Sequence, residues 1–130
     1  MPRARPKPSV DAVVIGRNEG ARLVACLQSL QGQVRRVIYV DSGSTDGSVE
    51  AAQRLGAEVV ALNMALPFTA ARARNAGLKE LRGNPPDYVQ FLDGDCVLRE
   101  GWVERASKFL TENLRAAVVC GRRRERHPEA

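Results

Sequence analysis

Asp93 and Asp95 are the residues of this sequence whose type and spacing most directly suggest chemistry. They follow the apolar run 88–92 and are separated by a single glycine. Because side chains of an extended chain alternate with a period of two, the two carboxylates are expected to point the same way. Such a pair can bind a cation, act as an acid and a base, or lie in a solvated turn, and the spacing alone leaves these three possibilities open.

Polar residues also follow two earlier apolar runs. The run 10–15 is followed by residues 16–19, and the run 37–40 is followed by residues 41–46. In a parallel sheet, ligands bind outside the carboxyl ends of the strands, so we expect these residues to meet Asp93 at one edge. The sequence contains neither the glycine fingerprint of dinucleotide-binding folds nor a P-loop, so neither motif explains this edge.

Strand-like and helix-like segments alternate along the chain. The segments predicted as strands are 10–16, 36–41, 57–62, 87–93 and 116–121. Helices are predicted over 21–30, 47–56, 69–82 and 100–114. In the first helix, Leu23, Cys26, Leu27 and Leu30 share one face. This alternation predicts an α/β fold with a mainly parallel, Rossmann-like sheet and helices on both faces.

Length and composition place the chain among globular domains. Its 130 residues suffice for one domain, with 44% hydrophobic and 27% charged residues. No apolar run approaches the roughly 20 residues of a membrane-spanning helix, and the N-terminus has no apolar segment typical of a secretory signal. Three cysteines without metal-ligand spacing favour a reducing, cytoplasmic location.

The net charge of +5 is concentrated at the two ends of the chain. We therefore expect a disordered basic arm over 1–9, a folded domain over 10–121 and a basic tail over 122–130. The basic ends could contact an anionic membrane surface, which would make the cytoplasmic protein membrane-associated. Only 5% of the residues are aromatic, which argues against nucleic-acid binding by base stacking.

Four short motifs together resemble the family 2 glycosyltransferases, which use nucleotide sugars and have the GT-A fold. They are IGRNEG (15–20), VDSGSTDGS (40–48), ARNAGL (73–78) and FLDGDC (91–96), in the order of the family and at about its spacings. The resemblance covers nearly the whole range 10–121. It implies the N-terminal, nucleotide-sugar-binding half of a transferase, with residues 122–130 as the start of an acceptor half.

The resemblance also implies a metal at the Asp93-Gly94-Asp95 motif. Asp95 would bind Mg²⁺ or Mn²⁺ directly, while Asp93 would contact the ribose and reach the metal directly or through water. Gly94 would let the nucleotide approach closely. A hard cation takes oxygen ligands and, by bridging the two phosphates, lowers the barrier to departure of the nucleoside diphosphate.

The resemblance implies further contacts with a UDP-sugar or GDP-sugar. The predicted nucleotide-sugar-binding residues are Arg17, Asn18, Glu19, Asp41, Ser42, Arg74, Asn75, Asp93 and Gly94. Ser42 stands where the family often has a second aspartate, so the identity of the base stays open. Arg74 is preferred over Arg72 because it matches the motif, and arginines two positions apart do not share a helix face.

Other roles near these motifs are interpreted from their residue types. Ser44, Thr45 and Asp46 precede the second predicted helix, and we expect them to cap it. The family implies transfer with inversion to a sugar or lipid acceptor, in polysaccharide or glycolipid synthesis, but no residue can be assigned as the general base. The 130-residue chain is therefore expected to bind the sugar donor and to transfer sugar poorly or not at all.

Two other functions also fit the sequence. Haloacid-dehalogenase-type phosphatases resemble it around Asp93 and Asp95, which would be nucleophile and acid/base, although Lys108 is the only lysine that follows. A non-catalytic nucleotide-binding domain is the third possibility.

Overall fold

Eight secondary-structure elements alternate along residues 7–122, the part of the chain that the computed structural model describes. They are β1 (Val10–Gly16), α1 (Ala21–Leu30), β2 (Val37–Asp41), α2 (Ser48–Arg54), β3 (Glu58–Ala61), α3 (Ala70–Glu80), β4 (Tyr88–Asp93) and α4 (Trp102–Glu112). The predicted α/β alternation is thus confirmed. The strand predicted over 116–121 is wrong, because that segment has neither helix nor strand structure and pairs with no described strand.

The four strands form one parallel sheet in the order β3-β2-β1-β4. The register aligns the carboxyl ends of the three strands that carry polar residues, since Gly16 lies opposite Asp41 and Ile15 lies opposite Asp93. The prediction that these strands are parallel neighbours ending at one edge is confirmed.

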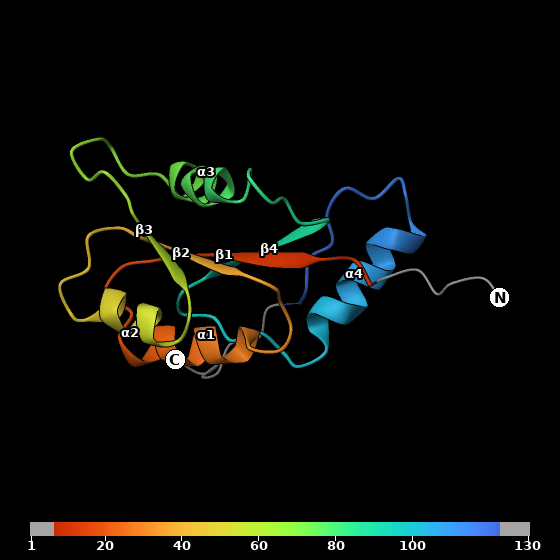
Figure 1. Cartoon of the computed structure of the whole chain (residues 1–130), viewed down its shortest axis with the longest axis horizontal. Helices are drawn as coiled ribbons and strands as arrows, with labels where there is room; N and C mark the ends of the chain where they lie inside the picture. Colours follow the sequence, from red (N-terminus) through yellow and green to blue (C-terminus); the bar gives the residue numbers. More distant parts are fainter. Residues whose placement is uncertain (1–6, 123–130) are drawn as a thin grey trace.

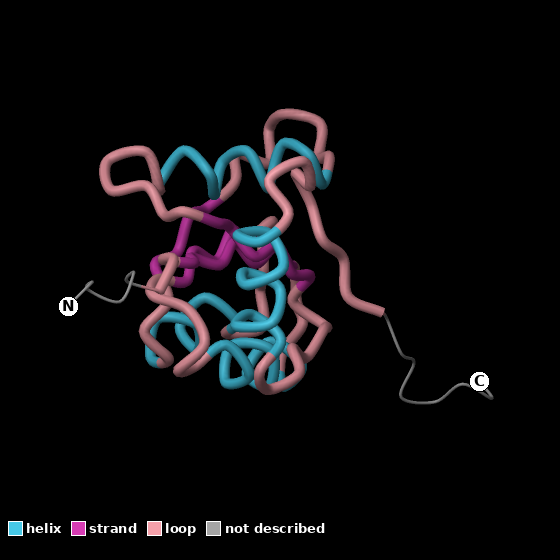
Figure 2. The backbone as a smooth tube through the Cα atoms, turned by 90° about the vertical axis from the view of Figure 1, so that its right-hand side faces the viewer, coloured by secondary structure: helices cyan, strands magenta, loops and turns pink. Residues whose placement is uncertain are grey.

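Helices cover both faces of the sheet, as Figure 1 shows with α3 above the strands and α1 and α2 below them. The buried face of α1 is the one expected, made of Leu23, Cys26, Leu27 and Leu30, and it packs against Val14 and Tyr39. Figure 2 shows the same layers after a quarter turn. The mainly parallel sheet between helices that the resemblance implies is therefore present.

α3 approaches the other face very closely. A Cβ added at Gly77 would lie 2.5 Å from Cγ1 of Val13, and both Val13 and Val40 beneath it are fully buried. The absence of a side chain at Gly77 thus lets α3 pack directly on β1 and β2. This contact sets the position of the helix that carries Arg74.

α4 lies beside β4, joined to it by a hydrogen bond from Trp102 Nε1 to Gln90 Oε1 of 2.9 Å. No helix within residues 7–122 has the length and apolar character needed to cross a bilayer.

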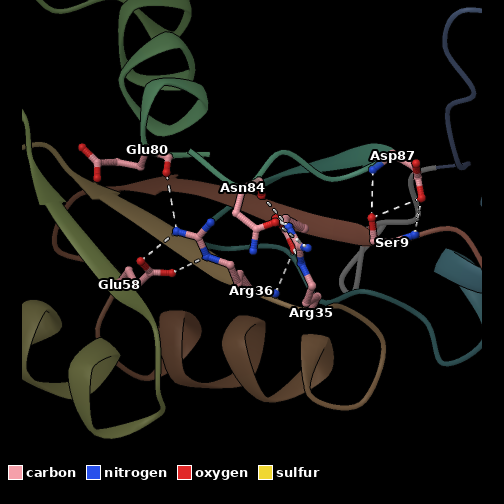
Figure 3. Close-up of polar contacts among 8 residues, drawn as sticks. Ser9, Arg35, Arg36, Glu58, Glu80, Asn84 and Asp87 are labelled. Atoms are coloured by element: carbon pink, nitrogen blue, oxygen red, sulfur yellow. Dashed lines mark hydrogen bonds and ion pairs between the residues drawn. The ribbon is translucent and has the colours of Figure 1, made fainter. Parts of the chain in front are cut away.

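A polar network holds the amino edge of the sheet, opposite the predicted site (Figure 3). The fully buried carboxylate of Asp11 accepts hydrogen bonds from Arg35 Nε at 3.0 Å and Nη2 at 2.8 Å. The Arg35 guanidinium also reaches the carbonyl of Asn84 at 2.7 Å, so it joins β1 to the loop before β4. A buried charge needs such partners, and we interpret this network as structural.

Ser9 lies within the range predicted as a disordered arm, yet its N–H donates to Asp87 Oδ2 at 2.7 Å. Figure 3 shows this contact. Residues 1–6 of the predicted arm and residues 123–130 of the predicted tail lie outside the described residues.

Candidate functional site

The end of β1 holds the polar loops on both of its sides. The carbonyl of Ile15 accepts the N–H of Gly94 at 2.8 Å, and the carbonyl of Gly16 accepts the N–H of Ser42 at 3.0 Å. Because β1 is the central strand between β2 and β4, these bonds bring the predicted motifs after all three strands to one edge.

Asp93 and Asp95 are both exposed at this edge. Asp93 Oδ1 lies 3.4 Å from Nη2 of Arg74, which extends from α3, and their side chains are 55% and 40% exposed. Oδ1 of Asp95 accepts a hydrogen bond from the thiol of Cys96 at 3.5 Å. A carboxylate and a guanidinium on the solvent side of the edge can bind a cation and a phosphate, respectively.

Arg72 has a different position from Arg74, as their spacing predicts. Its guanidinium donates to the backbone carbonyls of Leu66 at 3.2 Å and Pro67 at 3.0 Å, and also to that of Asn63. Arg72 therefore holds the loop between β3 and α3. Asn75 is exposed and lines a groove between these two elements with Arg72, so the structure does not bring it to Asp93.

Gly94 is buried, and packing within the protein explains why this position is occupied by a glycine. An added Cβ would lie 3.2 Å from the carbonyl oxygen of Ile15 and 3.4 Å from Cγ of Glu19. A side chain would thus crowd the end of β1. The predicted role of Gly94, close approach of the nucleotide, stays a prediction.

Asp41 is 4% exposed, and its carboxylate accepts four hydrogen bonds from the protein. Oδ1 accepts the hydroxyls of Tyr39 at 2.8 Å and Ser44 at 2.5 Å, and Oδ2 accepts the N–H groups of Gly43 at 3.2 Å and Ser44 at 2.8 Å. Burial, together with the bond to Asp41, raises the pKa of Tyr39 above its usual range. In this structure Asp41 shapes the turn after β2.

Asn18 connects the loop after β1 to the loop after β2. Its N–H donates to Ser44 Oγ at 2.9 Å, and its Oδ1 accepts the N–H of Thr45 at 2.7 Å. Its φ of 50° lies in the left-handed region, which asparagine tolerates better than most residues. Arg17, before it, is exposed.

Two buried polar atoms at this edge have no hydrogen-bond partner among the described residues: Ser42 Oγ and Glu19 Oε2. Ser42 is 4% exposed. Glu19 Oε2 lies 3.1 Å from Nε of Arg22, close enough for an ion pair, although it makes no hydrogen bond. Buried polar atoms without a partner are rare in folded proteins, so Ser42 Oγ marks a position where a ligand could bond, whereas Glu19 Oε2 is already paired with Arg22.

The expected capping of α2 by Ser44 and Thr45 is wrong. The N-cap is Gly47, and Ser44 bonds Asp41 instead. Asp46 comes nearest to the prediction, because its Oδ1 accepts both the N–H of Ser48 at 3.0 Å and its hydroxyl at 2.5 Å. The hydroxyl bond lowers the pKa of Asp46.

The sequence did not indicate the positioning roles of three residues, Tyr39, Ser44 and Ser48. Tyr39 and Asp41 are two apart on a strand and therefore share a face, so their contact could have been predicted. Ser44 and Ser48 depend on contacts between loops. Ser48 is 1% exposed and accepts a bond from the N–H of Gly20 at 3.4 Å, which no local pattern indicates.

The donor set at the edge agrees with a metal that is only partly held by protein. Residues 7–122 contain no group of three or more His, Cys, Asp or Glu side chains arranged to hold a metal ion. Two exposed carboxylates, those of Asp93 and Asp95, suit a hard cation such as Mg²⁺ that takes its other ligands from phosphate oxygens and water.

Solved structures with the same architecture define the class of the fold. TarS from S. aureus superposes with a TM-score of 0.68 at 23% identity, over 82% of this chain and 33% of the TarS chain. Glucosyl-3-phosphoglycerate synthase from Mycobacterium tuberculosis, crystallised with uridine diphosphate, gives a TM-score of 0.55 at 29% identity, over 69% of this chain and 35% of that chain. The fold is thus that of GT-A nucleotide-sugar transferases.

Sequence comparison then gives the family. The model for glycosyl transferase family 2 matches residues 11–129, and the chain belongs to that family. Its relatives include the glycosyltransferase GlyG of Streptococcus pneumoniae, 30% identical over 86% of this chain and 38% of GlyG. The glycosyltransferase AglE of Haloferax volcanii is 29% identical over 75% of this chain and 34% of AglE.

The chain spans only about a third of the length of these relatives. The family predicted from the four motifs is confirmed, and the match decides against the haloacid-dehalogenase-type alternative.

Proposed function

We propose that this domain binds the nucleoside diphosphate of a sugar donor at the carboxyl edge of the sheet and, with an acceptor-binding part, transfers the sugar. The observation that supports the proposal is the contact between Arg74 and Asp93, in which a guanidinium that could bind phosphate lies beside a carboxylate that could bind a metal ion. The synthase from Mycobacterium tuberculosis, 29% identical, has been crystallised with Mn²⁺ and uridine diphosphate. That relative favours a UDP-sugar over a GDP-sugar as the donor here.

Asp93 and Asp95 would hold Mg²⁺ or Mn²⁺. When bound, the ion would supply Lewis-acid stabilisation of the charge that develops on the departing diphosphate. The guanidinium of Arg74 would act on the same charge, because it extends from α3 beside the edge.

The nucleoside end of the donor is expected on the side of β2. Ser42 Oγ supplies a hydrogen-bonding atom that the described residues leave unused, and Glu19 Oε2 makes no hydrogen bond beside its ion pair with Arg22. Arg17 is exposed at the same loop and can approach a phosphate or the base. Asp41 and Asn18 contribute by holding the turns, because the Asp41 carboxylate and the Oδ1 of Asn18 bond within the protein, and their contacts with the nucleotide stay predictions.

Inversion of the anomeric carbon requires a base that removes the proton of the acceptor hydroxyl. No residue of this chain is assigned to that role. We infer that the base and the acceptor site belong to the part of the relatives that this chain does not match. A role in polysaccharide or glycolipid synthesis, a cytoplasmic location and contact of the basic ends with a membrane surface stay predictions.

Calorimetric titration with nucleoside diphosphates, with and without Mn²⁺, tests the proposal. We expect uridine diphosphate to bind more tightly with Mn²⁺, and Asp95→Ala to remove the Mn²⁺-dependent part without unfolding the chain, because Asp95 is exposed. Asp93→Ala should weaken it too. Glu112→Ala, an exposed acid at the end of α4, is the control. Equal Mn²⁺-dependent affinity in wild type and Asp95→Ala would refute the metal assignment.

Arg74→Gln should weaken uridine diphosphate binding more than uridine binding, since only the former carries the phosphates that Arg74 is proposed to contact. Arg54→Gln, an exposed arginine at the end of α2, is the matched control. An equal loss for both ligands would place Arg74 outside the diphosphate site.

A further inference from the structure

The guanidinium of Arg74 is held by a single weak contact. Its Nη2 lies 3.4 Å from Asp93 Oδ1, and within residues 7–122 this side chain makes no other hydrogen bond. By contrast, Arg35 and Arg36 each bind a carboxylate through two nitrogens, and each also donates to a backbone carbonyl. A guanidinium carries several N–H groups in a fixed fork, so most of those of Arg74 stay available to a ligand.

The same contact covers one oxygen of the Asp93 carboxylate. Oδ1 faces the guanidinium, whereas Oδ2 accepts no hydrogen bond from residues 7–122. A divalent cation bound at Oδ1 would lie beside the positive charge of Arg74, and like charges in close contact repel each other. The guanidinium is thus a counter-ion for Asp93 that the protein itself supplies, and it competes with a metal ion for the same carboxylate.

The backbone of both partners is fixed, so an exchange of partners involves side chains alone. Gly77, three residues after Arg74, packs α3 directly on the sheet, and the N–H of Gly94, next to Asp93, bonds a carbonyl of β1 at 2.8 Å. The side chains of Arg74 and Asp93 are 40% and 55% exposed. Exposed ion pairs are weak, so a ligand with several negative charges can replace Asp93 as the partner of Arg74.

We propose that Arg74 is a switch between two partners: it pairs with Asp93 before the donor binds, and it turns to the diphosphate when the donor arrives. In the first state the guanidinium weakens metal binding at Asp93. In the second state it leaves this carboxylate to the metal ion. Metal and diphosphate binding are therefore coupled through Arg74. The second state rests on the proposed function, whereas the first is a property of the chain without any nucleotide.

A purely structural ion pair is the other interpretation, and it predicts a different sign. If the contact only held α3 beside the end of β4, loss of Arg74 would weaken the binding of metal and of diphosphate alike. If Arg74 covers Asp93, its loss strengthens the binding of the metal alone and weakens that of the diphosphate. Measurement of the metal alone therefore distinguishes the two interpretations.

Titration of Mn²⁺ with the full chain, followed by the paramagnetic resonance signal of the free ion, tests the first state. We expect Arg74→Gln to bind Mn²⁺ about two- to fivefold more tightly than wild type, which is the range that an exposed ion pair supports. Repetition of the titration with saturating uridine diphosphate tests the second state. The factor by which uridine diphosphate raises the Mn²⁺ affinity should be smaller in Arg74→Gln, by the same two- to fivefold or more.

Arg99→Gln is the matched control for the loss of charge. Arg99 is exposed, follows Asp95 in the same loop and forms no ion pair within residues 7–122. Its replacement removes the same charge without uncovering Asp93. Because salt screens exposed charges that are not in contact, Mn²⁺ binding should stay within about 1.5-fold of wild type. Circular dichroism shows whether each variant is folded.

Unchanged or weaker Mn²⁺ binding by Arg74→Gln without nucleotide would overturn the proposal. Equal gains in Arg74→Gln and Arg99→Gln would do the same, because they would show an effect of net charge alone. An equal effect of uridine diphosphate on the Mn²⁺ affinity of wild type and Arg74→Gln would refute the second state. Failure of the proposed function has a different signature: uridine diphosphate then fails to bind wild type in calorimetry, while the comparison with Mn²⁺ alone still tests the first state.

Discussion

Substitutions of Asp41 can distinguish two roles for this residue, holding the turn after β2 or contacting the nucleotide. In Asp41→Ala, the N–H groups of Gly43 and Ser44 lose their acceptor, and two hydroxyls lose theirs. A hydrogen bond to a charged acceptor contributes about 1.5 to 3 kcal/mol, and the lower value applies to each of the two N–H groups because their turn is only partly buried, while the hydroxyls of Tyr39 and Ser44 can rotate to other partners. We therefore expect the free energy of unfolding to fall by about 3 kcal/mol.

Asp41→Asn is the informative companion. Its amide oxygen can accept the two N–H groups in place of Oδ2, and its NH₂ can donate to the hydroxyl oxygens of Tyr39 and Ser44, which then reverse their roles. The charge is lost but the bonds remain. We expect this variant to lose only about 1 kcal/mol, because hydrogen bonds to a charged acceptor are somewhat stronger than neutral ones.

Urea denaturation followed by circular dichroism measures both losses. With a slope of about 1.5 kcal/mol per molar urea, a loss of about 3 kcal/mol shifts the midpoint by about 2 M. A stability of Asp41→Ala within about 0.5 kcal/mol of wild type, accompanied by loss of uridine diphosphate affinity, would refute the positioning role. Asp41 would then contact the nucleotide, as the family resemblance implies.

Three further predictions concern the packing of α3, the burial of a thiol and the turnover by this chain. Gly77→Ala should destabilise the fold by about 1 to 2 kcal/mol in urea denaturation, because the clash with Val13 at 2.5 Å outweighs the gain of about 1 kcal/mol in helix propensity. The control Ala71→Gly, on the exposed side of α3, should lose only about 1 kcal/mol of stability through its lower helix propensity. Burial raises the pKa of the Cys26 thiol from 9.0 to about 12, so iodoacetamide at pH 8 should label exposed Cys120 and spare Cys26 until the protein unfolds. Above about pH 9 only the unfolded thiol ionises, so the free energy of unfolding should fall as pH rises from 9 towards 12. Rapid labelling of Cys26 in the folded protein, detected by mass spectrometry, would contradict this prediction. When the 130-residue chain is incubated with labelled nucleotide sugars, Mn²⁺ and mixed acceptors, we expect sugar transfer well below an ordinary enzymatic rate. A transfer rate of about 1 per second or faster would show that this chain already holds all the catalytic residues.

Local pattern in the sequence was sufficient for the elements and for the edge at which they end. The spacing of Leu23, Cys26, Leu27 and Leu30 fixes the buried face of α1, because helical period depends only on neighbouring residues. The alternation of strands and helices requires crossovers and hence a parallel sheet, so the positions of Asp41 and Asp93 at one edge follow from topology.

The strand predicted over 116–121 shows where local pattern is insufficient. Its valines have high β propensity, but a strand exists only when another strand pairs with it. Among the described residues β4 is hydrogen-bonded to β1 alone, and the segment after α4 does not join it.

Within the site, the sequence by itself determined which residue types gather at the edge, and the tertiary structure decided what each one contacts. Arg72 and Arg74 differ only by position on a helix, yet one braces a loop through backbone carbonyls and the other meets Asp93. Asp41 and Gly94 were predicted as nucleotide contacts, but their bonds and packing lie within the protein. The physical reason is range: periodicity is set by adjacent residues, whereas hydrogen bonds between loops depend on chain segments that only the folded sheet brings together.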